Sequence, residues 1–373
     1  MIYLDANASE RPRPEARAAL LAAAELAGNP ASIHAAGRAA RRVLESARET
    51  LAAGLGAASS GVVFTSGGTE SNALAIAALG AGRRLIAGAT EHDAVRAAAL
   101  TAGGGDVLPV DEAGRADLAA LEHLLARGEP SLVCLMLANN ETGTIQDVAA
   151  AAALCRRAGA RLHVDAVQAV GRMTVDLAAL GADSLALSGH KFGGPPGAGA
   201  LLLAGEAALA PLIAGGGQER GRRGGTPALP AIAGMAAAME AALAALADPA
   251  RPGHPAALAA LRDRVEDAAR AAGAVICGAG AARLPNTTSL ALPGVPAERQ
   301  VIALDLEGFA VSAGAACSSG KVTRSHVLEA MGLGELAGQA IRVSLPWSAT
   351  VAEVEAFIAA YTRMAARLGR GAA

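Results

Sequence analysis

The sequence predicts an α/β protein with a large N-terminal domain and a smaller α+β domain behind it. Before residue 248, short apolar runs of strand type alternate with helix-type segments. That alternation is typical of a mostly parallel sheet with helices on both faces. Several of the runs end in polar groups, as strands do where their carboxyl ends open into a site. Residues 248–253, Asp-Pro-Ala-Arg-Pro-Gly, form the best linker in the chain, and the pattern changes after them.

Length and composition agree with two domains and a large core. The chain has 373 residues, of which 53% are hydrophobic and 18% are charged, so it is not a disordered protein. The formal net charge of −2 argues against a nucleic-acid partner held by the overall field of the protein. The N-terminus shows no signal peptide, and Arg and Glu interrupt the alanine tracts at helical spacing. We therefore expect a soluble protein with no membrane partner.

The four cysteines indicate a reducing compartment. Cys134, Cys155, Cys277 and Cys317 include no C-x-x-C pair, and they are too sparse for a disulfide framework. A cytoplasmic location is the natural expectation. Because Cys134 lies inside a predicted strand and Cys155 inside a predicted helix, we expect both to be small buried apolar residues.

Residues 3–14, which include Pro12 and Pro14, are expected to form an extended arm before the large domain. Gly28-Asn29-Pro30 stops a first helix near residue 26. A long arginine-rich helix then runs to residue 55, and His34 at its start is expected to be a cap or a surface group. Further strands are expected at residues 62–65, 84–89, near 107, at 132–138, from 162, from 184, and at 199–203.

The small domain follows a helix predicted at residues 227–247 and the linker. We expect its helices at residues 254–272 and 297–307 and from residue 351 onward. Its strands are expected to end at residue 277 and to cover residues 289–292, 309–312 and 340–345.

A glycine turn joins the strand at 62–65 to the next helix. Ser66-Gly67-Gly68-Thr69 places free backbone N–H groups and the positive end of the helix dipole at one point, which suits an anion. A plain capped helix is the alternative, because the motif is neither a Walker loop nor a dinucleotide fingerprint.

Lys191 and Asp165 are the most informative pair. Lys191 is one of only two lysines in the chain and lies between His190 and an apolar glycine-rich turn. A free lysine, with a pKa of about 10.4, becomes a useful nucleophile when it is desolvated or placed beside other cations. Its typical chemistry is a Schiff base with a carbonyl substrate or with pyridoxal 5'-phosphate (PLP). PLP also needs an acid at its pyridine nitrogen, and Asp165 ends the preceding strand.

The motifs His163-Val-Asp-Ala-Val-Gln-Ala-Val-Gly171 and Leu187-Ser-Gly-His-Lys191 resemble those of the class V aminotransferase family of PLP enzymes. More closely, they resemble cysteine desulfurases of the nitrogen-fixation and housekeeping iron–sulfur type. The resemblance runs from Tyr3 to about Pro346. It implies PLP-dependent transferase fold type I with a seven-stranded sheet. It further implies an arm at residues 1–14 packing with the small domain, a PLP-binding domain at 15–248 and a small domain at 249–373.

The resemblance also implies roles for individual residues. Lys191 would bind PLP, Asp165 would hold the pyridine nitrogen and Gln168 the ring oxygen, and His92 would stack on the ring and handle protons on the substrate. Asn140 would lie near the cofactor and, with Arg342, would bind the substrate carboxylate. Gly68 would contact the cofactor. The expected phosphate ligands are Thr69, Ser188, His190 and, from the partner of a homodimer that shares its active sites, Thr226.

Cys317 lies in a second informative stretch, Ser312-Ala-Gly-Ala-Ala-Cys-Ser-Ser-Gly320. Small residues and glycines predict an exposed loop, and Lys321 and Arg324 are near enough to favour a thiolate. In the related family this pattern carries the cysteine that forms a persulfide. The small domain is therefore expected to carry the nucleophile.

The resemblance implies conversion of L-cysteine to L-alanine, with sulfur passed from Cys317 to an acceptor or scaffold protein for iron–sulfur clusters or other sulfur trafficking. Another class V reaction, transamination or selenocysteine cleavage, stays open, and so does a non-catalytic sulfur relay. The sequence has no G-x-G-x-x-G motif after its first strand, which argues against a nicotinamide oxidoreductase. The sequence departs from the family at Ala6–Glu10 and after Thr226, where Pro227-Ala228 stands.

Overall fold

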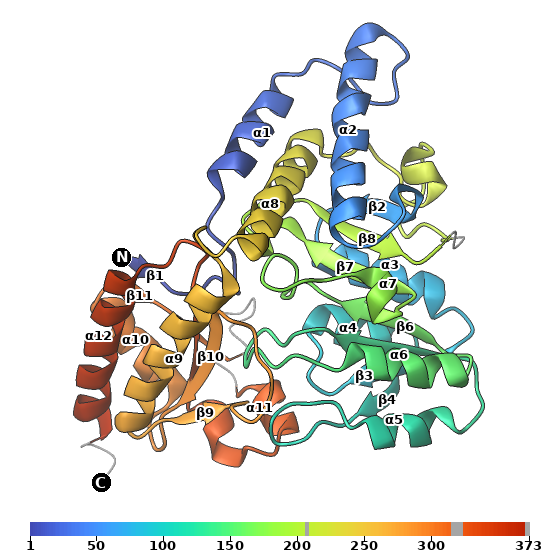
Figure 1. Ribbon diagram of the computed structural model, residues 1–373. Helices are drawn as coiled ribbons and strands as arrows, with labels where there is room; N and C mark the ends of the chain where they lie inside the picture. The colour runs from blue at the N-terminus through green and yellow to red at the C-terminus, as the bar shows by residue number, and fades with distance from the viewer. Residues whose placement is uncertain (206–208, 315–323, 370–373) are drawn as a thin grey trace.

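The computed structural model describes residues 1–205, 209–314 and 324–369. Within these residues, the N-terminal two thirds of the chain form a seven-stranded sheet and the C-terminal third forms a four-stranded sheet. Figure 1 shows the larger sheet with its helices in blue to yellow and the smaller layer in orange and red, with the N-terminal strand beside the smaller layer.

The seven-stranded sheet is mostly parallel, as predicted. Its order is β2-β8-β7-β6-β5-β3-β4, and only β8 runs antiparallel to its neighbours β2 and β7. Between β7 and β8 the chain forms only the short 3-10 turn η2 (Gly189–Lys191). A parallel neighbour would need a crossover of about a dozen residues or more, so the chain returns antiparallel. The strands are β2 (Val62–Thr65), β3 (Arg84–Gly88), β4 (Gly105–Leu108), β5 (Ser131–Met136), β6 (Arg161–Asp165), β7 (Ser184–Ser188) and β8 (Gly199–Leu203).

Helices cover both faces of this sheet. Along β2, Val62 and Phe64 belong to the large core under α2, while Val63 packs with Leu74 of α3 on the other face. This alternation is the period of two that a pleated strand imposes. The helices are α1 (Pro14–Ala24), α2 (Ala35–Gly54), α3 (Gly68–Leu79), α4 (Asp93–Thr101), α5 (Leu118–Leu125), α6 (Val148–Arg157), α7 (Leu177–Leu180) and α8 (Leu229–Ala247), with 3-10 turns η1 (Ser59–Gly61) and η3 (Gln218–Gly221).

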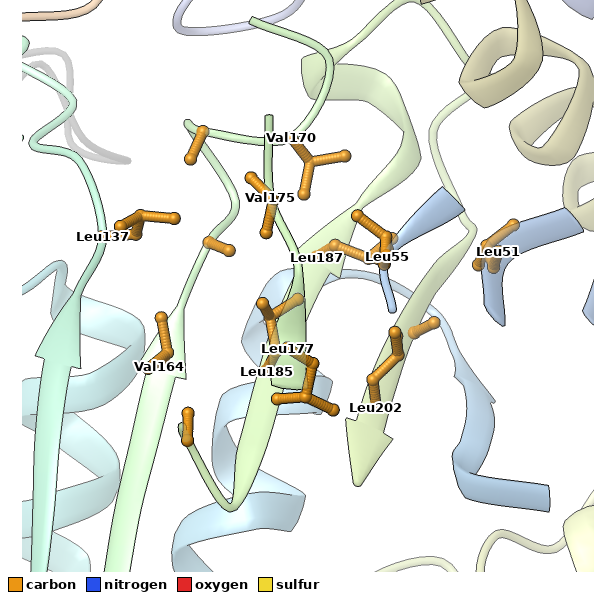
Figure 2. Packing of buried hydrophobic residues seen from close by; sticks show 14 of the residues in the cluster. Leu51, Leu55, Leu137, Val164, Val170, Val175, Leu177, Leu185, Leu187 and Leu202 are labelled. Carbon is orange, nitrogen blue, oxygen red and sulfur yellow. The ribbon is translucent and has the colours of Figure 1, made fainter. Parts of the chain in front are cut away.

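The largest core lies between the sheet and the helices α2 and α5 to α8. In Figure 2, Leu55, the residue that follows α2, lies beside Leu187 of β7, and Leu51 of α2 and Leu202 of β8 belong to the same buried cluster. Burying one such side chain contributes about 1.5–3 kcal/mol. This layer therefore holds the strand ends rigidly in place.

Helix α8 belongs to the same core. Among the helices of the described residues, it alone is long and apolar enough to cross a membrane by length and composition. In this structure it packs against α1 and α2, with Met235 and Met239 fully buried. A core helix passes the same test of length and apolarity.

The smaller sheet is antiparallel, with the order β12-β13-β10-β9. Phe357 and Tyr361 of α12 pack in its core with residues of α9 and α10, and α11 covers a separate small cluster. The elements are α9 (Pro255–Ala271), β9 (Val275–Cys277), β10 (Thr287–Ala291), α10 (Ala297–Leu306), β12 (Ser312–Ala313), α11 (His326–Ala330), η4 (Gly334–Gly338), β13 (Ala340–Ser344) and α12 (Val351–Gly369).

The prediction of one strand at residues 309–312 was wrong. Phe309–Ala310 is β11, which pairs in parallel with β1 (Ile2–Tyr3), whereas Ser312–Ala313 is β12 and pairs with β13. The backbone changes partner at Val311, because the arm provides the hydrogen bonds on one side and β13 provides those on the other. The arm thus pairs with the C-terminal third before it reaches the larger sheet.

Other local predictions were confirmed. The His34 ring caps α2, with Nδ1 accepting from the Gly37 N–H at 3.2 Å. Cys134 and Cys155 are buried.

Strand β10 begins two residues earlier than predicted, because Thr287 and Thr288 pair with Ser344 and Val343 of β13.

Candidate functional site

A cavity of about 140 Å³ opens at the carboxyl ends of β5, β6 and β7, beside the start of α3. Nine of the residues singled out from the sequence line it: Gly68, Thr69, His92, Asn140, Asp165, Gln168, Ser188, His190 and Lys191. The fold thus gathers residues spread over more than a hundred positions of the chain.

One end of the cavity is built to receive an anion. Gly67 precedes α3 and caps it without a side chain, so the first-turn N–H groups point outward. A Cβ on Gly68 would come within 2.7 Å of Val167, so only glycine lets the backbone lie this close to the neighbouring turn. Thr69 and Ser188 add hydroxyl groups to the same end.

His190 lies beside this end of the cavity. Its pKa is lowered to about 4, chiefly by burial and then by the charges of Lys191 and Arg172. The ring is therefore neutral at physiological pH, and Nδ1 lies 3.3 Å from the Ser9 hydroxyl.

Asp165 ends β6 and is 5% exposed. One carboxylate oxygen accepts from the Val167 N–H at 2.9 Å and the other from the Asn72 amide at 2.7 Å. The pKa of Asp165 is raised on balance, because burial outweighs the opposing effects of these donors and of the neighbouring His92 and Lys191. The carboxylate is held in one orientation at the floor of the cavity.

Lys191 follows β7 and reaches across the cavity to the N-terminal arm. Its ammonium donates to the carbonyl oxygens of Asn7 at 2.7 Å and Ala8 at 2.9 Å. Burial lowers the pKa of Lys191 to about 8, with smaller effects of the same sign from Arg342 and Arg172. This agrees with the expectation of a desolvated lysine beside other cations.

His92 and Gln168 contact the same opening. His92 caps α4 through Nδ1, which accepts from the Ala94 N–H at 3.1 Å, so the proton of the neutral ring is on Nε2. Gln168 donates to the Asn7 carbonyl at 3.0 Å. Asn7 O therefore accepts from both Lys191 and Gln168, which joins the arm to the turn after β6.

Arg342 enters from β13 of the smaller sheet. Its Nη2 pairs with the Asp5 carboxylate at 2.6 Å, and Nη1 donates to the Asn140 carbonyl at 3.2 Å. Arg342 Nε is buried and has no hydrogen-bond partner among the described residues. The guanidinium is thus oriented by the arm and keeps a donor for another anion.

Thr226 is not among the residues that line this cavity within one chain. It lines a separate hollow with Ser66 and Glu219. A buried ion pair anchors this loop, because Glu219 accepts from both terminal nitrogens of Arg48 at 2.8 and 2.9 Å. A contact of Thr226 with a partner's cofactor stays a prediction.

Cys317 and Lys321 lie outside the described residues. The residues that follow this segment contact the chain next to Asn140 and His92: the Ser325 hydroxyl donates to the Glu141 carboxylate, and His326 Nε2 lies 3.0 Å from the Glu91 carbonyl oxygen.

The sequence interpretation missed the contribution of the arm and of two buried polar residues. Asn7, Asn72 and His163 all make hydrogen bonds at or next to the cavity. A usable signal existed for His163, because it lies two residues before Asp165 and so shares its face of β6.

Comparison with known proteins decides the family. A family model described as aminotransferase class V matches residues 2–357. The chain belongs to the class V aminotransferase family. Within it, the chain is 43% identical to a cysteine desulfurase of Cereibacter sphaeroides, over 95% of this chain and 93% of that protein. It is 37% identical to an IscS-like cysteine desulfurase of Mycobacterium tuberculosis, over 100% of this chain and 98% of that protein.

Solved structures agree. A NifS-like protein from Rickettsia africae matches with a TM-score of 0.90 and 34% identity, over 98% of this chain and 99% of that chain. The resemblance to cysteine desulfurases and the expectation of fold type I are confirmed.

The residues present fit PLP, the cofactor of this family. The side-chain-free cradle at Gly68 and the start of α3 suit the phosphate. Asp165 provides a buried carboxylate elsewhere in the same cavity, and Lys191 provides an amine whose pKa is low enough for a Schiff base.

Proposed function

We propose that this protein is a PLP-dependent cysteine desulfurase that converts L-cysteine to L-alanine and carries the sulfur as a persulfide on Cys317. The proposal rests on one observation above all: Lys191, Asp165 and the free start of α3 meet in a single cavity. The curated relatives covering nearly the whole chain are named cysteine desulfurases. The test is release of alanine and sulfide from L-cysteine in the presence of a thiol reductant.

In this proposal, Lys191 would hold PLP through its amine, and Asp165 would hold the pyridine nitrogen. Thr69, Ser188 and His190 would bind the phosphate, Gln168 would bind the ring oxygen, and His92 would lie against the ring. When bound, PLP supplies an electron sink for charge at the substrate Cα. Asp165 suits its place because its carboxylate is already oriented by two donors before any ligand arrives.

The side chains of the site then handle the substrate. Lys191 Nζ removes the Cα proton of L-cysteine, and His92, whose neutral ring carries its proton on Nε2, donates a proton to the substrate. The Cys317 thiolate attacks the substrate sulfur, so that an S–S bond forms while the Cβ–S bond breaks. A proton delivered to Cβ completes the methyl group of alanine. Transfer of the outer sulfur atom of the persulfide to an acceptor returns Cys317 to the thiolate.

Arg342 is proposed to bind the substrate carboxylate together with Asn140. We expect Arg342→Ala to raise KM for L-cysteine about ten- to a hundredfold, since hydrogen bonds to charged groups contribute about 1.5–3 kcal/mol. Steady-state kinetics measure this, and Arg363→Ala on the exposed face of α12 is the matched control. An unchanged KM in an Arg342 variant that still binds PLP would remove Arg342 from the substrate site.

The pKa of Lys191 predicts how PLP uptake depends on pH. The unprotonated amine is the nucleophile, and its fraction rises as pH increases through about 8. We expect the rate of PLP incorporation into cofactor-free protein to rise over the same interval and to level off above it. Stopped-flow absorbance measures the rate. A midpoint near 10.4, the value for free lysine, would show that the amine is not desolvated.

A homodimer, a sulfur-acceptor protein and a cytoplasmic location complete the proposal. Support for the dimer comes from the loop at residues 215–226, which is anchored by Arg48 and Glu219 away from its own cavity. Support for a reducing compartment comes from Cys134, Cys155 and Cys277, which are buried free thiols. Sedimentation velocity tests the oligomeric state, and a purely monomeric active enzyme would contradict the shared site.

A further inference from the structure

A chain of buried polar groups leads from the core to Asp165. His163 Nε2 lies 2.8 Å from Asn72 Oδ1, and His163 Nδ1 lies 2.8 Å from the Ser184 hydroxyl. Asn72 Nδ2 in turn donates to Asp165 at 2.7 Å. All four residues are at most 5% exposed. These contacts lie between α3 and the sheet, in a layer otherwise filled by apolar side chains.

The local fold explains why these groups meet. His163 and Asp165 lie two residues apart on β6 and so share a face, and Ser184 of β7 is the register partner of His163. Asn72 is in the first turns of α3, the helix whose start faces the anion end of the cavity. One helix therefore carries both the proposed phosphate cradle and the amide that contacts Asp165.

The direction of every hydrogen bond in the chain follows from Asp165. An ionised carboxylate only accepts, so Asn72 must present its amide nitrogen to Asp165 and its oxygen to His163. His163 then carries its proton on Nε2, and Nδ1 accepts from the Ser184 hydroxyl. Burial lowers the pKa of His163 to about 3, which keeps the ring neutral. Each dipole in the chain points its positive end toward Asp165.

We propose that His163 and Asn72 are positioning residues that keep the Asp165 carboxylate ionised and oriented toward the pyridine nitrogen of PLP. Burial alone favours a protonated Asp165, which would leave the pyridine nitrogen unprotonated and weaken the electron sink. The oriented donors oppose that effect without adding a charge. The inference rests on the proposed function, since it concerns the cofactor of that same site.

The test is the ¹⁵N chemical shift of ¹⁵N-labelled PLP in the holoenzyme without substrate. We expect the wild type to show a protonated pyridine nitrogen, and His163→Leu and Asn72→Leu to shift toward the unprotonated value. We also expect the Kd for PLP to rise about tenfold, the effect of losing one charge-assisted hydrogen bond. In kinetics, kcat should fall while KM for L-cysteine stays nearly constant.

Three further variants make the result specific. His163→Gln restores a donor toward Asn72 and should return the shift most of the way. Ser184→Ala removes only a hydroxyl group, so this variant should fold even if a leucine variant does not. It should move the ¹⁵N shift toward the unprotonated value, but by less than the leucine variants do. Val164→Ala disturbs the other face of β6, where Val164 is fully buried, and should lower Tm without moving the shift.

Two failures are distinguishable. A wild-type protein that binds no PLP would overturn the proposed function and this inference with it. A wild type that shows a protonated pyridine nitrogen, together with an unchanged shift in His163→Leu, Asn72→Leu and Ser184→Ala, would overturn the inference alone. The buried chain would then serve only to satisfy its own polar groups.

Discussion

Lys191→Ala is expected to abolish both covalent attachment of PLP and turnover of L-cysteine. The variant removes the amine that attaches the cofactor and the base that takes the Cα proton. A positioned general base alone contributes about 10²–10⁴ in rate, so we expect kcat to fall at least about a thousandfold. The cavity should still admit PLP, because its anion end at the start of α3 is untouched.

Borohydride reduction followed by peptide mass spectrometry measures this directly. In the wild type, PLP should be fixed to the peptide that contains Lys191, and in Lys191→Ala it should be fixed nowhere. Attachment to the peptide with Lys321, the other lysine of the sequence, would contradict the assignment.

Cys317→Ala should stop sulfur release while leaving the PLP absorbance band intact. Without the thiol, no group takes the sulfur from the substrate, so we expect sulfide production to fall about a thousandfold or more, in line with loss of a covalent nucleophile. The band is expected to persist because the Lys191 site does not need Cys317.

Cys155→Ala is the matched control for Cys317→Ala. Cys155 is buried in α6, and burial raises its pKa to about 12, so it supplies no thiolate at neutral pH. Its replacement should leave sulfide release nearly unchanged. Full activity in Cys317→Ala, or loss of activity in Cys155→Ala with the fold retained, would move the nucleophile elsewhere.

The sheet and most of the cavity were predictable because the signals are local. Apolar strands that end in Asp165 and Ser188 place their polar ends at one edge of a parallel sheet. The glycine turn before α3 announces an anion site through backbone geometry alone. These features need no knowledge of distant contacts.

The contacts of the arm and the chain of buried polar groups that leads to Asp165 could not be predicted in the same way. Asn7 contacts Asn140 and Thr287, which are more than a hundred residues away in sequence. Strand β11 is separate from β12 only because Ile2 and Tyr3 pair with it. The role of His163 depends on Asn72 from another element, so its pattern in the sequence is that of an ordinary core residue. Such contacts are set by tertiary packing.

The most direct test of the central claim is intact-protein and peptide mass spectrometry after a brief reaction with L-cysteine, without reductant. The proposed function predicts one added sulfur atom on the peptide that contains Cys317, with alanine formed in equal amount. The added mass should disappear when a thiol reductant follows. Alanine or a keto acid formed with no sulfur on Cys317 would contradict the desulfurase mechanism and favour another class V reaction.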